Sequence, residues 1–220
     1  QAIERFGNAV RPSYGMSEAT FITAYNNFGH DPDHPQRLAS CGLPYADTQI
    51  EIRDDDDRVL PAGEVGEVWV KAGLMMAGYW GDPELTQQTL VDGWLRTGDV
   101  GYLDADGYVY LVDRLKDMII TGYSATNVYC RPVEDALNAH PDVRAAAVIG
   151  VPDPTIGELV HAYVVVAPDA SATPADIRTF VIGQLNELWA PREVEFVDSL
   201  PLTAMGKVDK KALRARYAAR

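Results

Sequence analysis

The sequence predicts an α+β fold in which a strand-rich first part is followed by a part that mixes strands and helices. Two observations predict this class: short β-like stretches fill the early chain, and helical spacing begins only later. The composition changes between them at VDRLKD, where a strand stops at two oppositely charged pairs. We therefore expect one domain over residues 1–113 and a second over residues 114–220.

The first part consists of short strands separated by turns. Residues 48–54 (TQIEIRD) and 64–72 (EVGEVWVKA) alternate in polarity or are rich in β-branched residues, which is typical of strands. The segments DDDD, PAGE and DADG supply the Asp, Gly and Pro residues that favour turns. This part is therefore predicted to be mostly β-structure.

The second part contains both kinds of element. Residues 132–140 (PVEDALNAH) have helical spacing, whereas VRAAAVIGV and LVHAYVVVA are typical of strands. The segment TPADIRTFVIGQLNEL predicts a helix with Thr173 as N-cap, because Pro174 is favoured at the first helical position and Asp176 stands three residues after the cap.

Composition and charge exclude some classes of function. With 220 residues, 47% of them hydrophobic, the chain has enough apolar material for a sizeable core. Its net charge of -13 disfavours nucleic acid as a partner, because phosphate contacts need clustered Lys and Arg. Basic residues concentrate only in the last stretch, GKVDKKALRARYAAR, which either holds a small phosphorylated ligand or is a solvated helix face.

The cysteines and the termini indicate the setting of the protein. Cys41 and Cys130 match no metal-ligand spacing and suggest no disulfide framework. There is no apolar run of the roughly 20 residues that a membrane span needs, and the first residues lack the pattern of a signal peptide. We expect a cytoplasmic protein without a transmembrane segment, and the first residue, Gln1, suggests a fragment of a longer chain.

The segment YGMSEAT, residues 14–20, combines an aromatic ring, a glycine, a hydroxyl and a carboxylate. Ser17 has the hydroxyl to donate a hydrogen bond to a phosphate oxygen, and Glu18 has the carboxylate to hold Mg2+. The alternative is structural, because Ser-Glu before an apolar run is also how helices begin.

Two further segments carry candidate groups. Thr97, Gly98 and Asp99 are predicted to end a strand in a tight turn, where a carboxylate can accept hydrogen bonds from both hydroxyls of a ribose; otherwise this is a plain Gly-Asp turn. Lys207 follows a glycine in a loop before a helix. It either delivers an ammonium group to a reacting phosphate or is an ordinary solvated lysine.

Five segments, in this order, resemble the C-terminal part of adenylate-forming acyl-CoA synthetases, the superfamily that also contains luciferases and peptide-synthetase adenylation domains. They are YGMSEAT, GYWGDPELTQQTLVDGWLRTGD, GYLDADGYVYLVDRLKDMIITG, VEDALNAHPDVRAAAVIGVPD and PLTAMGKVDKKALR. The resemblance implies that residues 1–113 close the large AMP-binding domain, including a distorted β-barrel subdomain, and that residues 114–220 form its mobile C-terminal domain.

The resemblance also implies a reaction in two steps. A carboxylic acid, with fatty acids as the expected class, attacks the α-phosphate of ATP to give an acyl-adenylate and pyrophosphate. A thiol, that of coenzyme A, then displaces AMP. The implied cofactors and substrates are ATP, Mg2+, coenzyme A and a small carboxylic acid, and no oligomeric state is predicted.

Roles for particular residues follow from the same resemblance. The nucleotide and the acyl carboxylate would be bound by Tyr14, Gly15, Asp99 and Arg114. Ser17 would contact the α-phosphate and Glu18 would bind Mg2+. Lys207 would bridge the attacking carboxylate and the α-phosphate, because two anions approach each other and a fixed positive charge offsets their repulsion.

The second half-reaction depends on a different face of the smaller domain. Lys116 would be the hinge about which that domain rotates, and Gly122 would belong to the loop that lines the thiol. Here the sequence departs from the family, since GYSATNVYC is longer than usual and has Cys130 where Pro is common. Tyr123 also brings a bulky ring to a place where the family usually has Gly.

A Gly/Ser/Thr-rich phosphate loop, which the family carries upstream of YGMSEAT, is not among these 220 residues. We therefore expect an acid-thiol ligase segment that is inactive as an isolated chain. Two alternatives stay open: an adenylation domain that loads a carrier protein, and a truncated binding module without catalysis.

Overall fold

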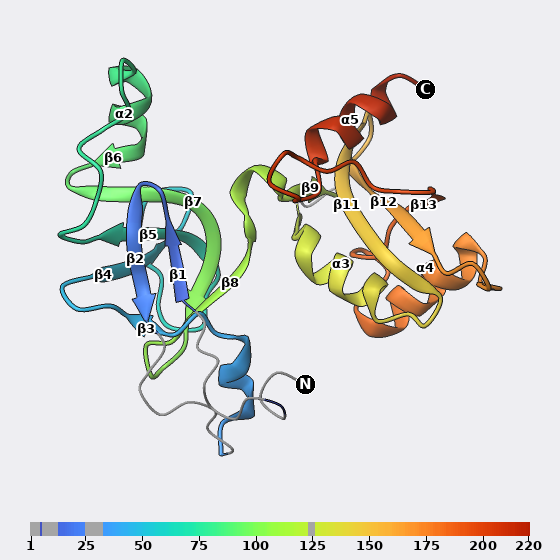
Figure 1. The fold of residues 1–220 in the computed structure, drawn as a ribbon, viewed down its shortest axis with the longest axis horizontal. Helices are drawn as coiled ribbons and strands as arrows, with labels where there is room; N and C mark the ends of the chain where they lie inside the picture. Colours follow the sequence, from blue (N-terminus) through green and yellow to red (C-terminus); the bar gives the residue numbers. More distant parts are fainter. Residues whose placement is uncertain (1–4, 6–12, 25–32, 123–125) are drawn as a thin grey trace. The chain divides into compact units, whose positions relative to one another are not determined.

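The computed structural model describes residue 5 and residues 13–24, 33–122 and 126–220. The chain divides into two compact units between Leu115 and Lys116, within the VDRLKD segment. We call the residues up to Leu115 unit 1 and those from Lys116 onward unit 2. The predicted α+β class is confirmed, since unit 1 is mostly strands and unit 2 contains strands and helices (Figure 1). Within the described ranges, no helix is long and apolar enough to cross a membrane.

Unit 1 contains two antiparallel sheets. The smaller has the order β1-β2-β3, and the larger has the order β4-β5-β7-β6 with β8 also paired to β7. Across the described part of unit 1 these sheets stay open, so the expected β-barrel is not closed. The elements are β1 (Ser13–Met16), β2 (Ala19–Ala24), η2 (Pro35–Ala39), β3 (Leu43–Pro44), β4 (Gln49–Arg53), β5 (Gly66–Lys71), α2 (Pro83–Thr89), β6 (Leu90–Val91), β7 (Trp94–Leu103) and β8 (Val109–Arg114).

The core of unit 1 lies between the two sheets. Ile52 of β4 and Val68 and Val70 of β5 turn toward the smaller sheet, because alternate residues of a strand face the same side. The fully or nearly buried members of this core are Tyr14, Ala19, Ile22, Ile52, Val68, Val70 and Leu95. On its other face, the larger sheet carries Trp69, whose ring is covered by the guanidinium groups of Arg53 at 4.2 Å and Arg96 at 5.0 Å.

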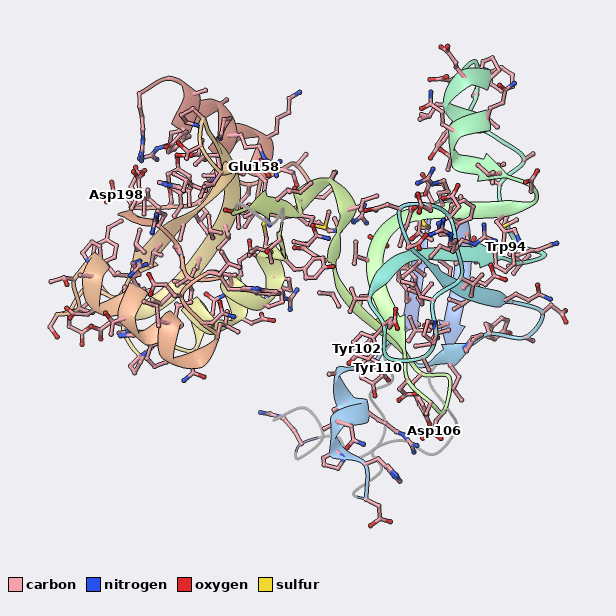
Figure 2. All side chains as sticks on the ribbon, turned by 180° about the vertical axis from the view of Figure 1, so that it is seen from behind. Trp94, Tyr102, Asp106, Tyr110, Glu158 and Asp198 are labelled. Carbon is pink, nitrogen blue, oxygen red and sulfur yellow. The ribbon has the colours of Figure 1, made fainter. Side chains whose placement is uncertain are left out.

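The pairing of β7 with β8 fixes one side of the candidate site. Tyr102 is opposite Tyr110, and Asp99 is opposite Arg114. The two tyrosine rings stack with their centroids 4.8 Å apart (Figure 2). Cross-strand aromatic pairs stabilise a particular register, and an irregularity between Val100 and Gly101 separates this pair from the Asp99–Arg114 pair.

Unit 2 is built on one five-stranded sheet with the order β10-β9-β12-β11 and with β13 parallel to β12. Helices α3 and α4 pack on one face through Val148, Val160 and their neighbours. Helix α5 packs on the other face through Leu213, which belongs to the same buried cluster as Ile149 and Tyr163 (Figure 1). The boundary between the units falls within η3 (Leu115–Asp117), and the elements of unit 2 are β9 (Ile119–Thr121), β10 (Thr126–Val128), α3 (Cys130–Asn138), β11 (Val143–Asp153), β12 (Gly157–Val166), α4 (Pro174–Gln184), β13 (Glu193–Phe196) and α5 (Lys210–Ala218).

The predicted start of α4 is confirmed in detail. Thr173 is the N-cap, and its hydroxyl accepts a hydrogen bond from the backbone N–H of Asp176. The Asp176 carboxylate in return accepts a bond from the backbone N–H of Thr173 at 2.9 Å. Pro174 occupies the first helical position. Two N–H groups that would otherwise lack a partner are thereby satisfied.

Candidate functional site

Asp99 is presented by an irregularity in β7. We predicted that Thr97, Gly98 and Asp99 end a strand in a tight turn, and this is wrong, because β7 continues from Trp94 to Leu103. Glu67 pairs with Val100 and Trp69 pairs with Arg96, so β7 carries extra residues opposite β5. Such a bulge redirects side chains. Gly98 supplies the left-handed backbone, with φ of 66°, that the irregularity needs.

The carboxylate of Asp99 bonds to Tyr14 and Arg114, two other residues that the resemblance assigned to nucleotide binding. Its Oδ1 lies 2.7 Å from Nε of Arg114, and its Oδ2 accepts a hydrogen bond from the hydroxyl of Tyr14 at 2.5 Å. Asp99 is 5% exposed, whereas the side chain of Arg114 is 50% exposed. Burial, together with the Asp99 charge, raises the pKa of Tyr14, so the phenol keeps the proton that it donates.

Tyr14 and Gly15 lie in the hairpin of β1 and β2. The backbone N–H of Tyr14 donates to Oγ1 of Thr23 at 3.0 Å, and that hydroxyl donates to the carbonyl of Cys41. A Cβ at Gly15 would lie 2.2 Å from the backbone oxygen of Thr20. Real Cβ atoms do not approach so closely, so Gly15 is required by the hairpin itself, whatever it also does for a ligand.

Ser17 and Glu18 form the turn between β1 and β2. The alternative that they begin a helix is therefore wrong. Ser17 is exposed and Glu18 is half-buried. Oε1 of Glu18 accepts a hydrogen bond from the hydroxyl of Tyr79 at 2.8 Å. Tyr79 lies in one of the five segments that carry the resemblance, but its bond to Glu18 was not predicted, because the two residues are 61 positions apart.

Glu18 suits a hard cation that takes most of its ligands from a substrate. In the described ranges, no three His, Cys, Asp or Glu side chains gather closely enough to hold a metal ion. Mg2+ is commonly bound by one or two carboxylates, with substrate phosphates and water completing the octahedron. A lone half-buried carboxylate in a turn therefore fits Mg2+ that arrives with a nucleotide.

Lys207 lies in a tight loop of unit 2, directly before α5. The backbone N–H of Thr203 donates to the carbonyl of Lys207 at 2.7 Å, and Gly206 has φ of 76°. The side chain of Lys207 is exposed. The carboxylate of Asp209 caps α5 by accepting from the N–H of Ala212 at 3.0 Å. The loop is thus ordered by its backbone, and the ammonium group is left accessible.

The predicted hinge and thiol-loop residues also lie in unit 2. Lys116 is exposed in η3, and Gly122 follows β9 with φ of 80°. Tyr123, which the sequence placed at the thiol face, lies outside the described residues. After Lys116, the chain is fixed by Asp117, whose carboxylate accepts a bond from Arg214 of α5 and whose carbonyl accepts one from the thiol of Cys130, both at 2.9 Å.

Comparison with known proteins identifies the class. Two family models match the chain: AMP-binding enzyme over residues 1–80, and AMP-binding enzyme C-terminal domain over residues 132–207. Fold and matched segments together define a member of the adenylate-forming enzymes. The chain belongs to the AMP-binding enzyme family, as the five segments predicted.

The names of the similar proteins state different activities. A medium/long-chain-fatty-acid–CoA ligase, FadD8 of Mycobacterium tuberculosis, is 43% identical and matches 99% of this chain and 38% of its own length. A fatty acid–[acyl-carrier-protein] ligase, ScoC of Streptomyces coeruleorubidus, is 43% identical over 82% of this chain and 34% of its own length. The solved amide bond synthetase McbA from Marinactinospora thermotolerans is 50% identical, with a TM-score of 0.86, over 98% of this chain and 44% of its own. The chain thus spans less than half of the length of each of these three relatives.

Proposed function

We propose that this chain is part of an enzyme that activates a carboxylic acid with ATP and transfers the acyl group from the adenylate to coenzyme A. The observation that carries the proposal is the Asp99 carboxylate, which is bonded to both Tyr14 and Arg114. All three had been assigned to the nucleotide, although they are distant in the sequence. Membership of the AMP-binding family supports the same assignment.

In unit 1, the proposed roles concern binding. Each carboxylate oxygen has two acceptor positions, so Asp99 retains one on each oxygen for the ribose hydroxyls while it keeps Tyr14 and Arg114. Arg114, half exposed, reaches the same ribose. The ring of Tyr14, with Gly15 beside it, borders the adenine and the acyl carboxylate. Ser17 donates to the α-phosphate, and Glu18 binds Mg2+, which when present neutralises phosphate charge.

In unit 2, the proposed roles concern the reacting groups. The ammonium group of Lys207 lies between the attacking carboxylate oxygen and the α-phosphate, and lowers the energy of the charge that develops as the new P–O bond forms and pyrophosphate leaves. Lys116 is the hinge that exchanges this face for the one bearing Gly122. A thiol then attacks the acyl carbon, and AMP departs with the bonding electrons.

The names of the similar proteins differ in the molecule that accepts the acyl group. Coenzyme A is favoured by the ligase that matches nearly the whole chain. Two observations support an amine as second candidate: an amide bond synthetase is 50% identical over 98% of the chain, and GYSATNVYC departs from the usual thiol-face sequence. A carrier-protein thiol is a third possibility, in line with the acyl-carrier-protein ligase.

The test uses a protein that carries this chain together with the rest of the family's large domain. Acid-dependent exchange of pyrophosphate into ATP is expected with a panel of fatty and aromatic acids. This chain by itself is expected to show none, because the phosphate loop is not among its residues. Purified acyl-adenylate is then offered to equal concentrations of coenzyme A, an acyl carrier protein and a small primary amine, and the products are quantified by mass spectrometry.

The outcomes separate the candidates. Acyl-CoA as the main product supports the proposal, and an amide or an acylated carrier in its place would replace the acceptor while keeping the first step. Absence of exchange with every acid would favour the binding module. Exchange by the isolated chain would contradict the expectation that it is inactive.

A further inference from the structure

Within the described part of the chain, the side chain of Glu18 has one hydrogen-bonding partner, and that partner comes from another element. The hydroxyl of Tyr79, in the loop between β5 and α2, donates to Oε1 of Glu18 at 2.8 Å. Oε2 has no bond to any described residue. One oxygen of the carboxylate is therefore held by the protein, and the other is available.

The loop that carries Tyr79 is fastened to the Glu18 turn through its backbone. The N–H of Met76 donates to the carbonyl of Glu18 at 2.8 Å, and Met75 forms an isolated bridge with Ala19. These contacts hold the start of the loop next to the turn, so the approach of Tyr79 to Glu18 does not depend on the hydroxyl alone.

The far end of the loop is held by α2. The N–H of Tyr79 donates to Oγ1 of Thr86 at 2.9 Å, and that hydroxyl donates to the carbonyl of Asp82 at 2.7 Å. Asp82 is the N-cap of α2 and accepts a bond from the N–H of Leu85. The backbone of Tyr79 is thereby fixed on both sides, which directs its ring toward Glu18.

We propose that Tyr79 is a positioning residue that orients Glu18 for the Mg2+ ion of MgATP. The inference rests on the proposed function, in which Glu18 binds that ion. A glutamate has three rotatable side-chain bonds, and holding it in one rotamer costs conformational entropy. A bond to Oε1 meets that cost before the cation arrives and leaves Oε2 without a partner among the described residues. Partners that orient a metal ligand in this way typically change metal affinity by 10- to 100-fold.

The competing interpretation is that Tyr79 only secures the loop. Thr86→Val distinguishes the two, because it removes both loop bonds made by the Thr86 hydroxyl and leaves the phenol of Tyr79 in place. Tyr79→Phe does the reverse: it keeps the ring and the backbone bonds and removes the donor to Glu18. The two variants therefore form a matched pair.

The experiment uses the full-length protein that carries this chain, with Mn2+ as the probe and a non-hydrolysable ATP analogue. Binding of Mn2+ to the enzyme–nucleotide complex is measured by water-proton relaxation, and the KM for Mg2+ in pyrophosphate exchange is measured alongside. Tyr79→Phe is expected to weaken Mn2+ binding about tenfold and to raise the KM for Mg2+ similarly, with a smaller change in kcat. Thr86→Val is expected to lower the melting temperature with little change in Mn2+ affinity.

A double-mutant cycle completes the test. If Tyr79 acts through Glu18, Tyr79→Phe has no further effect on Mn2+ affinity once Glu18→Gln is present. Equal losses in the two backgrounds, wild-type affinity in Tyr79→Phe, or the same loss in Thr86→Val would each overturn the inference. The proposed function fails separately: in that case the unmutated protein shows neither exchange nor nucleotide-dependent Mn2+ binding.

Discussion

Asp99 in unit 1 and His161 in unit 2 are both buried ionisable side chains on the main sheet of their unit, and the two differ in their surroundings. In unit 1, Asp99 is 5% exposed and is bonded to Tyr14 and Arg114, both of which are predicted to bind the nucleotide. In unit 2, His161 is 1% exposed, and neither ring nitrogen has a hydrogen bond to any described residue. Its ring centroid lies 5.0 Å from that of Tyr217 of α5.

This difference separates two uses of a buried polar group. In unit 1 the cluster of Tyr14, Asp99 and Arg114 is itself the candidate site, so a substitution there should affect both ligand binding and stability. In unit 2 the buried group packs against α5, while Lys207 lies exposed in the loop before that helix. A substitution in unit 2 should therefore change either activity or stability alone, whereas a substitution at the Asp99 cluster of unit 1 should change both.

Lys207→Ala gives the largest expected effect on the reaction. We expect acid-dependent pyrophosphate exchange by the full-length protein to fall by about a hundredfold or more, because the charge aimed at the reacting phosphate is removed. Thioester formation from supplied acyl-adenylate should stay largely intact. The melting temperature should not change, since the side chain is exposed. Lys211→Ala, in the first turn of α5, is the matched control and should leave both steps unchanged.

If both half-reactions fell equally in Lys207→Ala, the role assigned to this lysine would be wrong. If the melting temperature fell instead, Lys207 would contribute to stability as well as to the candidate site, as Asp99 is expected to do in unit 1.

Asp99→Asn is expected to have the next largest effect, and on two quantities together. The amide cannot receive both Tyr14 and Arg114 as the carboxylate does, and a hydrogen bond to a charged group contributes about 1.5–3 kcal/mol. We expect the free energy of unfolding to fall by roughly 2 kcal/mol and the KM for ATP to rise about tenfold. Urea unfolding of this chain and exchange kinetics of the full-length protein measure the two quantities.

Asp92→Asn is the control for this change, because it makes the same substitution at a turn position of unit 1 with φ of 51°, which Asn tolerates. A loss of stability in Asp99→Asn without any change in the KM for ATP would mean that Asp99 and its two partners stabilise the fold and do not bind the nucleotide.

Features that depend on neighbouring residues were predictable from the sequence. The capping box at Thr173 and Asp176 is confirmed because all its bonds lie within four residues. The alternation along β4 and β5 was equally local. The family, with its order of strands and helices, was predictable because five segments carry it together.

Features that depend on pairing between distant segments were not predictable. The strand continues through Gly98 because β5 pairs with β7 on both sides of the irregularity, and a Thr-Gly-Asp sequence alone is typical of a turn. Tyr79 was missed for the same reason: its partner, Glu18, is 61 positions away. The resemblance assigned Asp99 and Arg114 to the same ribose and Tyr14 to the adenine and the acyl carboxylate, and only the fold shows that the Asp99 carboxylate bonds to both of the others.

The smallest expected effect concerns His161, and it tests whether the buried group of unit 2 serves stability alone. Burial, reinforced by the nearby Arg220 charge, lowers the pKa of His161, although Glu193 opposes this shift. Nδ1 lies 3.2 Å from the Glu193 carboxylate and Nε2 lies 3.6 Å from that of Glu195. The ionisable or charged groups around it are Tyr163, Glu193, Glu195, Arg216, Tyr217 and Arg220.

The direction of the pH effect follows from the lowered pKa. An unfolded histidine binds a proton as the pH falls through about 6.5, whereas the folded protein resists it. The contribution of His161 to the free energy of unfolding is therefore fully present above this pH and is lost as the pH falls through the lower folded pKa, by at most about 1.4 kcal/mol for each pH unit.

We expect His161→Gln to flatten the pH dependence of the free energy of unfolding between pH 7 and 5, when urea unfolding is followed by amide NMR signals of β11 and β12. Asp176, whose pKa is lowered from 3.8 by its bonds to Thr173, acts only at lower pH. Parallel curves for the wild type and His161→Gln would show that some other group controls unit 2, whereas a change in the KM for ATP would show that its buried polar group belongs to the site after all.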